Sequence, residues 1–105
     1  MNAKRVVVTG LGMVTSLGND VQTTWNNLLA GVSGAGEVSH FDHSNFKTHF
    51  ACEVKDLDVC NLFDPKEQRR YDRNIHYAVH SAEQAIKDAG ISIADEDAYR
   101  YGIIY

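Results

Sequence analysis

The sequence alternates β-branched, apolar runs with amphipathic stretches of helical spacing, and this alternation is the feature that most restricts the fold. Residues 5–9 form the first run, which is almost entirely β-branched and ends at Gly10. Such a run is typical of a strand buried on both faces of an α/β sheet. Residues 10–18 are rich in glycine and small polar side chains, which indicates a connection with unusual backbone angles.

An amphipathic helix is predicted directly after this connection. Asn19 and Gln22 are three residues apart, as at a capping-box start, and Gly31 is placed to end the helix. The apolar stripe of this helix consists of Val21, Trp25, Leu28 and Leu29. Residues 31–48 show no sustained period, so we expect an irregular excursion there.

Two further strands are predicted. In residues 50–55 apolar positions alternate with more solvent-exposed ones, which predicts a strand with one buried face. The buried side is expected to hold Phe50, Cys52 and Val54. Residues 99–105 are rich in aromatic and β-branched side chains, and we expect a third strand that is still apolar at its last residue.

The best-defined helix lies between these two strands. Asp64 is suited to cap it, Pro65 to occupy its first position, and Glu67 to reach back as the third residue of a capping box. From Asp72 onward its apolar stripe consists of Ile75, Val79, Ala82, Ile86 and Ala89. Gly90 is placed to end the helix.

The resulting order, β-α-β-α-β, predicts parallel strands with right-handed crossovers in an open α/β sheet. Hydrophobic residues make up 44% of the 105 residues and charged ones 23%, as in a packed protein. The net charge of −4 argues against a nucleic-acid or anionic-membrane protein. No stretch approaches the roughly 18 apolar residues of a membrane span, so we expect a cytoplasmic protein.

A dinucleotide-binding site must be considered, because Gly10 and Gly12 form a G-x-G pattern between a strand and a helix. The third glycine of that pattern is missing, since Thr15 stands in its place. The helix also begins near Asn19, too late for its amide end to hold a pyrophosphate beside the glycines. A structural turn is therefore favoured, and no cofactor is predicted.

The histidines do not form a recognisable metal site. His76 and His80 have the spacing at which two imidazoles can share zinc, but no glutamate stands between them as in a zincin. His40, His43 and His49 lie in the irregular excursion without a cysteine or carboxylate at ligand spacing. Packed or solvated histidines are the simpler explanation, and no metal is predicted.

The two cysteines are interpreted as reduced, structural thiols. Cys52 lies in the alternating strand, and Cys60 lies in an acidic stretch that disfavours a thiolate. Their spacing matches neither a disulfide framework nor a zinc ribbon. No catalytic nucleophile is predicted in this chain.

The constellation that stands out is basic and consists of Lys66, Arg69, Arg70 and Arg73. Their spacing in the helix that begins at Pro65 places them on one face. Cations in a first turn oppose the helix dipole, so helix formation alone does not favour them there. Such a face in an acidic chain suits an acidic partner or a phosphate group. A solvated charged face, partly neutralised by Glu67 and Asp72, explains the spacing equally well.

Short strings in a fixed order carry a resemblance to a known family. They are Val6–Val14, Gly18-Asn19, Trp25, Leu28–Gly31, Ser33-Gly34, His40–Asp42, Phe50-Ala51, Val54–Asp56, Lys66–Arg70, Asp72 and Ala85–Gly90. In this order and spacing the chain resembles the β-ketoacyl-acyl-carrier-protein synthases over essentially all of its length. The string Lys66–Arg70 points to their elongating, type II class.

The resemblance implies a thiolase-like fold of two similar α/β halves, in which residues 1–105 would be an incomplete N-terminal portion. It also implies fatty-acid elongation by decarboxylative Claisen condensation with malonyl-acyl carrier protein, and a homodimer of the full-length enzyme. The family's catalytic cysteine and histidines match no residue of this chain. Lys66, Arg69 and Arg70 match the basic helix that receives acyl carrier protein, whereas Arg73 lies off that pattern.

The leading hypothesis is therefore a ketosynthase fragment that is inactive alone and poorly soluble, because missing strands would expose an apolar edge and face. The main alternative is a self-sufficient, non-catalytic module that binds acyl carrier protein. A small nucleotide-binding α/β protein ranks last. Acyl-chain preference stays open at this level.

Overall fold

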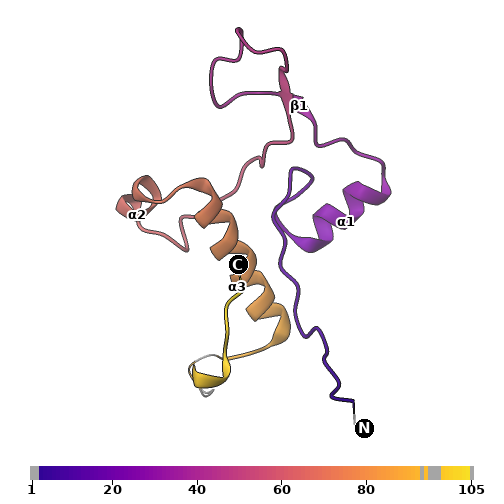
Figure 1. Ribbon diagram of the computed structural model, residues 1–105, viewed down its shortest axis with the longest axis vertical. Coiled ribbons are helices and arrows are strands. Elements are labelled where there is room, and N and C mark those ends of the chain that lie inside the picture. The colour runs from indigo at the N-terminus through magenta and orange to yellow at the C-terminus, as the bar shows by residue number, and fades with distance from the viewer. Residues whose placement is uncertain (1–2, 93, 95–97, 105) are drawn as a thin grey trace.

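The chain follows an open path around one long helix (Figure 1). The computed structural model describes residues 3–92, 94 and 98–104. The Cα radius of gyration is 17.5 Å, whereas a compact domain of about this length has a radius near ~13 Å. Within the described part, only Thr24, Val59 and Phe63 are buried. The described apolar residues therefore do not form one closed core.

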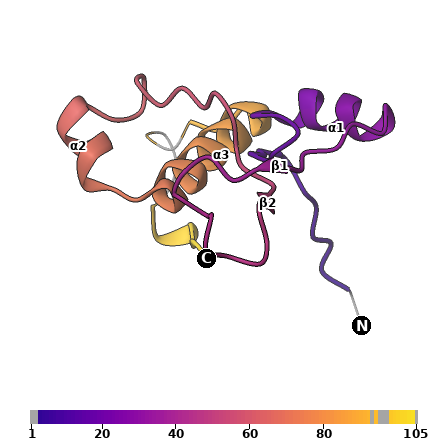
Figure 2. The ribbon, with the colours of Figure 1, turned by 90° about the horizontal axis from the view of Figure 1, so that it is seen from above.

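The helices are α1 (Val21–Leu29), α2 (Pro65–Arg70) and α3 (Arg73–Ala89), followed by the short 3-10 turn η2 (Ala98–Arg100). Strands β1 (Gly36–Glu37) and β2 (Phe50–Ala51) pair antiparallel as a hairpin. Seen from above, α1 and α2 lie on opposite sides of α3 (Figure 2). No helix in the described ranges is long and apolar enough to cross a membrane.

The predicted parallel sheet is not formed among the described residues, whose one sheet is the antiparallel pair of β1 and β2. Residues 5–9 lie in no strand, and Val6 is 94% exposed. Residues 99–104 also form no strand, since they begin in η2 and Ile103, near their end, is 96% exposed. Tyr105 lies outside the described residues. A strand needs a neighbour to pair its backbone N–H and C=O groups. Neither segment has such a neighbour in the part of the chain that the structure describes.

The predicted strand over residues 50–55 is reduced to the two residues of β2, and the predicted alternation of burial is reversed over residues 50–53. Phe50 and Cys52 are exposed, whereas Glu53 is half-buried. The cause is a polar contact across the hairpin: the amide and hydroxyl of Ser39 donate to the Glu53 carboxylate at 3.1 and 2.7 Å. Residues 31–48 are irregular as predicted except at β1, and they form the first strand and most of the loop of the hairpin.

Helix α1 begins one residue later than predicted. Asp20, and not Asn19, is the cap, and its carboxylate accepts the Thr23 amide at 2.7 Å. This bond is the main reason that the pKa of Asp20 is lowered. Gly31 ends the helix as predicted, with a left-handed φ of +69°. The apolar stripe is formed but not covered, and Trp25 is 55% exposed.

The helix predicted to run on from Pro65 is two helices. Tyr71 and Asp72 are extended, with ψ angles of 141° and 160°, and they separate α2 from α3. The Phe63 ring contacts both Tyr71, at 5.8 Å between ring centroids, and His76, at 4.8 Å. These aromatic contacts favour the break, because they draw Tyr71 back towards the residues before α2.

The glycine-rich segment packs directly on α3. A Cβ atom at Gly10 would overlap the Ala85 carbonyl oxygen, and one at Gly12 would overlap the Ser81 carbonyl oxygen. Only glycine allows this approach of backbone to helix. These two glycines therefore have a packing role against α3, whereas the tight turn expected at them comes later, at residues 16–17.

Side chains of α3 also satisfy the backbone of this segment. The amides of Leu11 and Met13 donate to Asp88 and Gln84 at 2.9 and 3.2 Å. The Gln84 amide group donates to the carbonyls of Met13 and Asn19 at 3.3 and 2.6 Å. No strand pairs with this segment among the described residues, and the helix makes hydrogen bonds that a neighbouring strand would otherwise make.

Candidate docking surface

Helix α2 has only six residues, and its start is fixed by the capping box that the sequence predicts. The Asp64 carboxylate accepts the amides of Lys66 and Glu67 at 2.7 and 2.8 Å. The Glu67 carboxylate in turn accepts the Asp64 amide at 3.1 Å. Pro65 takes the first position, where no amide is left unsatisfied. The cap holds this short helix in place without burying any of its residues.

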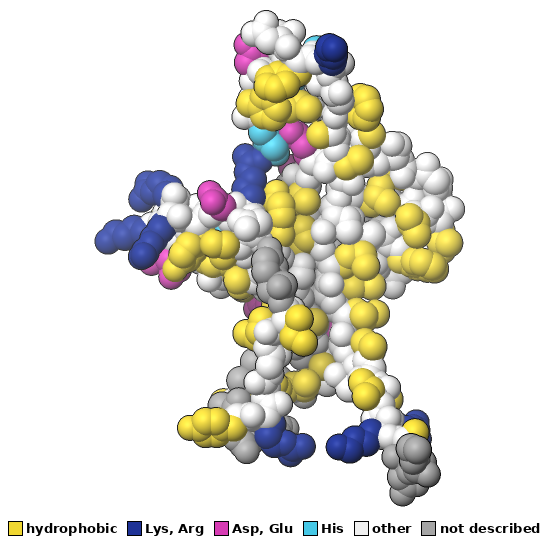
Figure 3. Space-filling model, in the orientation of Figure 1, with side chains coloured by type: hydrophobic (Ala, Val, Ile, Leu, Met, Phe, Trp, Pro, Cys, Tyr) yellow, Lys and Arg dark blue, Asp and Glu magenta, His cyan; other side chains and the backbone are white. Residues whose placement is uncertain are grey.

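The basic cluster of α2 consists of Lys66, Arg69 and Arg70, which are all exposed. Lys and Arg side chains gather at the side of the molecule where α2 lies (Figure 3). Within the described ranges, none of the three forms an ion pair. The Arg70 guanidinium lies over the Tyr71 ring, 5.9 Å from its centroid. The cluster is thus open to an anionic partner.

The nearby carboxylates do not neutralise this cluster by contact. Asp64 and Glu67 both bind main-chain amides at the start of α2. Asp72 forms no ion pair within the described ranges. Because these carboxylates do not contact the cations, the alternative of a self-neutralised charged face is weakened.

The helix dipole also acts differently from what the sequence suggested. Because α2 ends at Arg70, Arg69 and Arg70 lie in its last turn, where the helix dipole favours cations.

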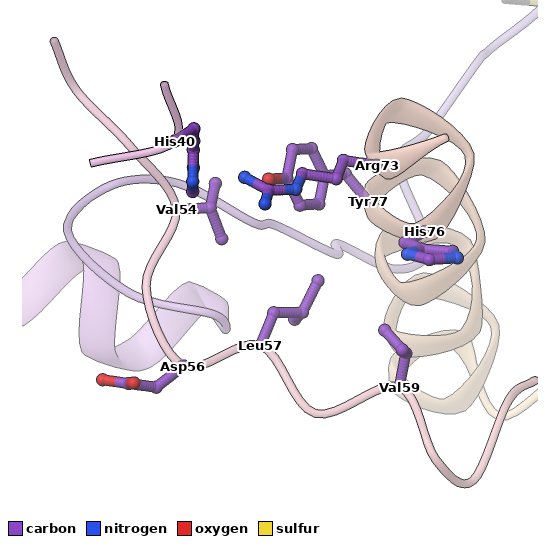
Figure 4. A pocket seen from close by; sticks show the side chains of 8 residues that line it. All are labelled: His40, Val54, Asp56, Leu57, Val59, Arg73, His76 and Tyr77. Carbon is purple, nitrogen blue, oxygen red and sulfur yellow. The ribbon is translucent and has the colours of Figure 1, made fainter. Parts of the chain in front are cut away.

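Arg73 does not belong to the basic cluster, contrary to the spacing argument. It is the first residue of α3, beyond the extended pair that ends α2. Its side chain extends with that of Tyr77 towards His40 and Val54 of the hairpin (Figure 4). These residues line a cavity of about 290 Å³ together with Leu57. Sequence reasoning missed this cavity because its walls come from segments distant in the chain, and no local motif marks it.

The histidines of the hairpin pair with each other and with carboxylates. His43 and His49 face each other with their Nδ1 atoms 2.8 Å apart, and His43 Nε2 lies 3.4 Å from Glu37. His40 Nε2 lies 3.6 Å from Glu53. In residues 3–92, 94 and 98–104 there is no group of three or more side chains suited to hold a metal ion.

Both cysteines are free thiols, as expected, but Cys52 is exposed and not buried on a strand face. The Cys60 amide donates to Asp58 at 2.9 Å and lowers the pKa of that carboxyl. Among the described residues, no side-chain base forms a hydrogen bond with either thiol, and no oxyanion hole lies beside one.

The sequence comparison defines the class of protein. The family model described as "Beta-ketoacyl synthase, N-terminal domain" matches residues 3–105. The chain therefore belongs to the β-ketoacyl synthase family, as its sequence resemblance implied. Among the solved structures, "The ishigamide ketosynthase/chain length factor" superposes with a TM-score of 0.74 at 35% identity, covering 85% of this chain and 22% of that one.

Two curated relatives are more specific. The chain is 43% identical to "3-oxoacyl-[acyl-carrier-protein] synthase 2" of Vibrio harveyi over 103 residues, which are 98% of this chain and 25% of that protein. It is 43% identical to the protein of the same name from Staphylococcus aureus (strain N315) over 100 residues, 95% of this chain and 24% of the relative. The chain thus spans about a quarter of the length of these relatives.

Proposed function

We propose that this chain is the carrier-protein-docking portion of a 3-oxoacyl-[acyl-carrier-protein] synthase of the elongating class. The observation that carries the proposal is the basic cluster of α2, three exposed cations without an ion-pair partner in the described part of the chain. The names of the relatives support acyl carrier protein as the partner. An acidic carrier protein would meet Lys66, Arg69 and Arg70 through charge complementarity.

The reaction proposed for the whole protein is a decarboxylative condensation that extends an acyl chain on the carrier protein. The chain's two cysteines and five histidines are not the residues proposed to carry it, so we expect no condensing activity from the chain alone. A thiolase-like architecture, a homodimer and a cytoplasmic location belong to the same proposal. Measurable ketoacyl product from residues 1–105 alone would contradict it.

The docking role is tested by binding of holo-acyl carrier protein to the full chain, measured by fluorescence anisotropy at low and high salt. Alanine at Lys66, Arg69 and Arg70 should weaken binding by about tenfold or more and flatten its salt dependence. The matched control removes three exposed cations elsewhere, Lys4, Arg5 and Lys47, and should change the dissociation constant by less than about twofold. Equal weakening in both variants would refute a localised docking surface.

A non-catalytic binding module remains the second candidate, and one observation favours it. The contacts that shape α2 are local: besides its capping box, Gln68 Nε2 donates to the Phe63 carbonyl at 2.9 Å. Docking of the chain could thus be retained without a catalytic site. A sharp, cooperative thermal transition of the isolated monomer, together with carrier-protein binding, would favour this candidate over a fragment of an enzyme.

A further inference from the structure

The cavity beside the first turns of α3 has unpaired hydrogen-bond donors on one wall. Arg73, His76 and Tyr77 stand at i, i+3 and i+4 of α3, so their side chains share one face of the helix. The Arg73 guanidinium and the Tyr77 hydroxyl have no hydrogen-bond or ion-pair partner in the described part of the chain. His76 Nε2 is buried and also unpaired among those residues.

The opposite wall is mostly apolar. Val54, Leu57 and Val59 come from the hairpin and the loop after it, and they face α3 across the cavity (Figure 4). The cavity of about 290 Å³ is near the small end of ligand sites, which span roughly 300–1,000 Å³. A small ligand with a short apolar body therefore fits the space better than a nucleotide or a long acyl chain.

Negative charge in the cavity wall is turned away or already paired. Asp56 lines the cavity, but its carboxylate points away from Arg73 (Figure 4). His40, which also lines the cavity, lies 3.6 Å from Glu53, whose carboxylate accepts two hydrogen bonds from Ser39. No carboxylate in the described structure therefore neutralises the Arg73 guanidinium by direct contact.

From these observations we propose that the cavity is a binding site for a small oxyanion, a phosphate or a carboxylate that carries a short aliphatic group. The guanidinium of Arg73 is suited to bind two oxygens of such a group through bidentate, charge-assisted hydrogen bonds. The Tyr77 hydroxyl supplies a further polar contact, and Val54 and Leu57 cover the aliphatic part. This site is separate from the basic cluster of α2, because the extended residues Tyr71 and Asp72 lie between α2 and Arg73.

The test is a titration of the full chain followed by backbone amide chemical shifts, at constant ionic strength set with chloride. Inorganic phosphate, n-butyl phosphate and butyrate serve as probes. We expect saturable shifts confined to residues 54–59 and 73–77, and tighter binding of a probe with a butyl group than of inorganic phosphate. Whether butyl phosphate or butyrate binds more tightly distinguishes a phosphate ligand from a carboxylate, and either result supports an oxyanion site.

Variants make the assignment specific. Arg73→Gln should weaken binding of the preferred probe by about tenfold or more, because it removes the charge-assisted pair. Tyr77→Phe keeps the ring and loses the hydroxyl, and should weaken binding severalfold without disturbing α3. Arg5→Gln removes the same charge at an exposed, distant position and should leave binding unchanged. Absence of saturable shifts with all three probes, or equal loss in the Arg5 and Arg73 variants, would overturn the proposal.

Discussion

The close packing of the glycine-rich segment on α3 predicts a large effect of a single methyl group. Gly12 lies so near α3 that the Cβ of an alanine would overlap the Ser81 carbonyl oxygen and lie 2.9 Å from the Ala85 amide nitrogen. Both atoms belong to helical backbone and cannot rotate aside. The Gly12→Ala variant must therefore move the N-terminal segment away from the helix.

This displacement breaks the hydrogen bonds that Gln84 makes with the segment. Its side chain is bonded to the Met13 amide, the Met13 carbonyl and the Asn19 carbonyl, at 3.2, 3.3 and 2.6 Å. A hydrogen bond contributes about 0.5–1.5 kcal/mol, and the lower value applies to these largely solvent-accessible groups. Three such bonds amount to about 1.5 kcal/mol, or about a tenfold change in the equilibrium between closed and open segment.

Amide hydrogen exchange measures this equilibrium locally and does not require cooperative unfolding. In Gly12→Ala the protection of the Met13 amide should fall about tenfold. The matched control is Gly36→Ala, because no atom lies within 4 Å of the added Cβ there. Gln84→Ala removes the same bonds without a steric clash and should reproduce the loss. Met13 protection that is as high in Gly12→Ala as in Gly36→Ala would refute the reasoning.

Three further predictions concern other parts of the chain. Asp64→Ala removes the cap of α2 and should destabilise the helix by about 1 kcal/mol, measured as faster hydrogen exchange of the α2 amides. The control Asp72→Ala should change little, because the Asp72 side chain makes no capping bond. Equal effects of the two substitutions would contradict this prediction. The Ser39 hydroxyl and amide lower the pKa of Glu53, so their contact stabilises the hairpin above the unfolded-state pKa of Glu53 and is lost as pH falls through the lower, folded value. Ser39→Ala should therefore raise the Glu53 pKa in a carbon-13 NMR titration, and an unchanged value would count against the contact. Val8 is 80% exposed, so Val8→Lys should reduce self-association in light scattering; an unchanged particle size would argue that other surfaces drive association.

The parts of the structure that sequence predicts well depend on neighbouring residues. The capping box of Asp64 and Glu67 forms as its spacing predicts. Gly31 and Gly90 end α1 and α3 with left-handed φ angles, because a residue without Cβ adopts that conformation at little cost. In each case the deciding atoms lie within four residues of each other along the chain.

The parts that sequence misses depend on distant partners. The β-branched run of residues 5–9 has the propensity of a strand, but propensity does not supply the neighbouring strand that pairing requires. The break between α2 and α3 depends on Phe63, whose ring contacts Tyr71 and His76. Continuous helical spacing across Arg70 and Arg73 gave no sign of it, so Arg73 was predicted on the wrong face.

The candidate docking surface shows both cases. Lys66, Arg69 and Arg70 are exposed on one short helix, as their spacing predicts. The direction of the neighbouring carboxylates, which bond to the start of α2, could not be read from spacing alone. The cavity beside Arg73 depends on three segments meeting in space, and its unpaired donors become visible only in the folded chain.

The contact between the glycine segment and α3 limits both partners to small residues. Gly10 and Gly12 meet α3 at Ser81, Ala85 and Ala89, which follow one another at four-residue intervals. In a hydrophobic pattern the two alanines count simply as apolar positions, yet the property that the contact uses is their small volume. A chimera that exchanges only one of them must therefore also import the matching small residues of the other.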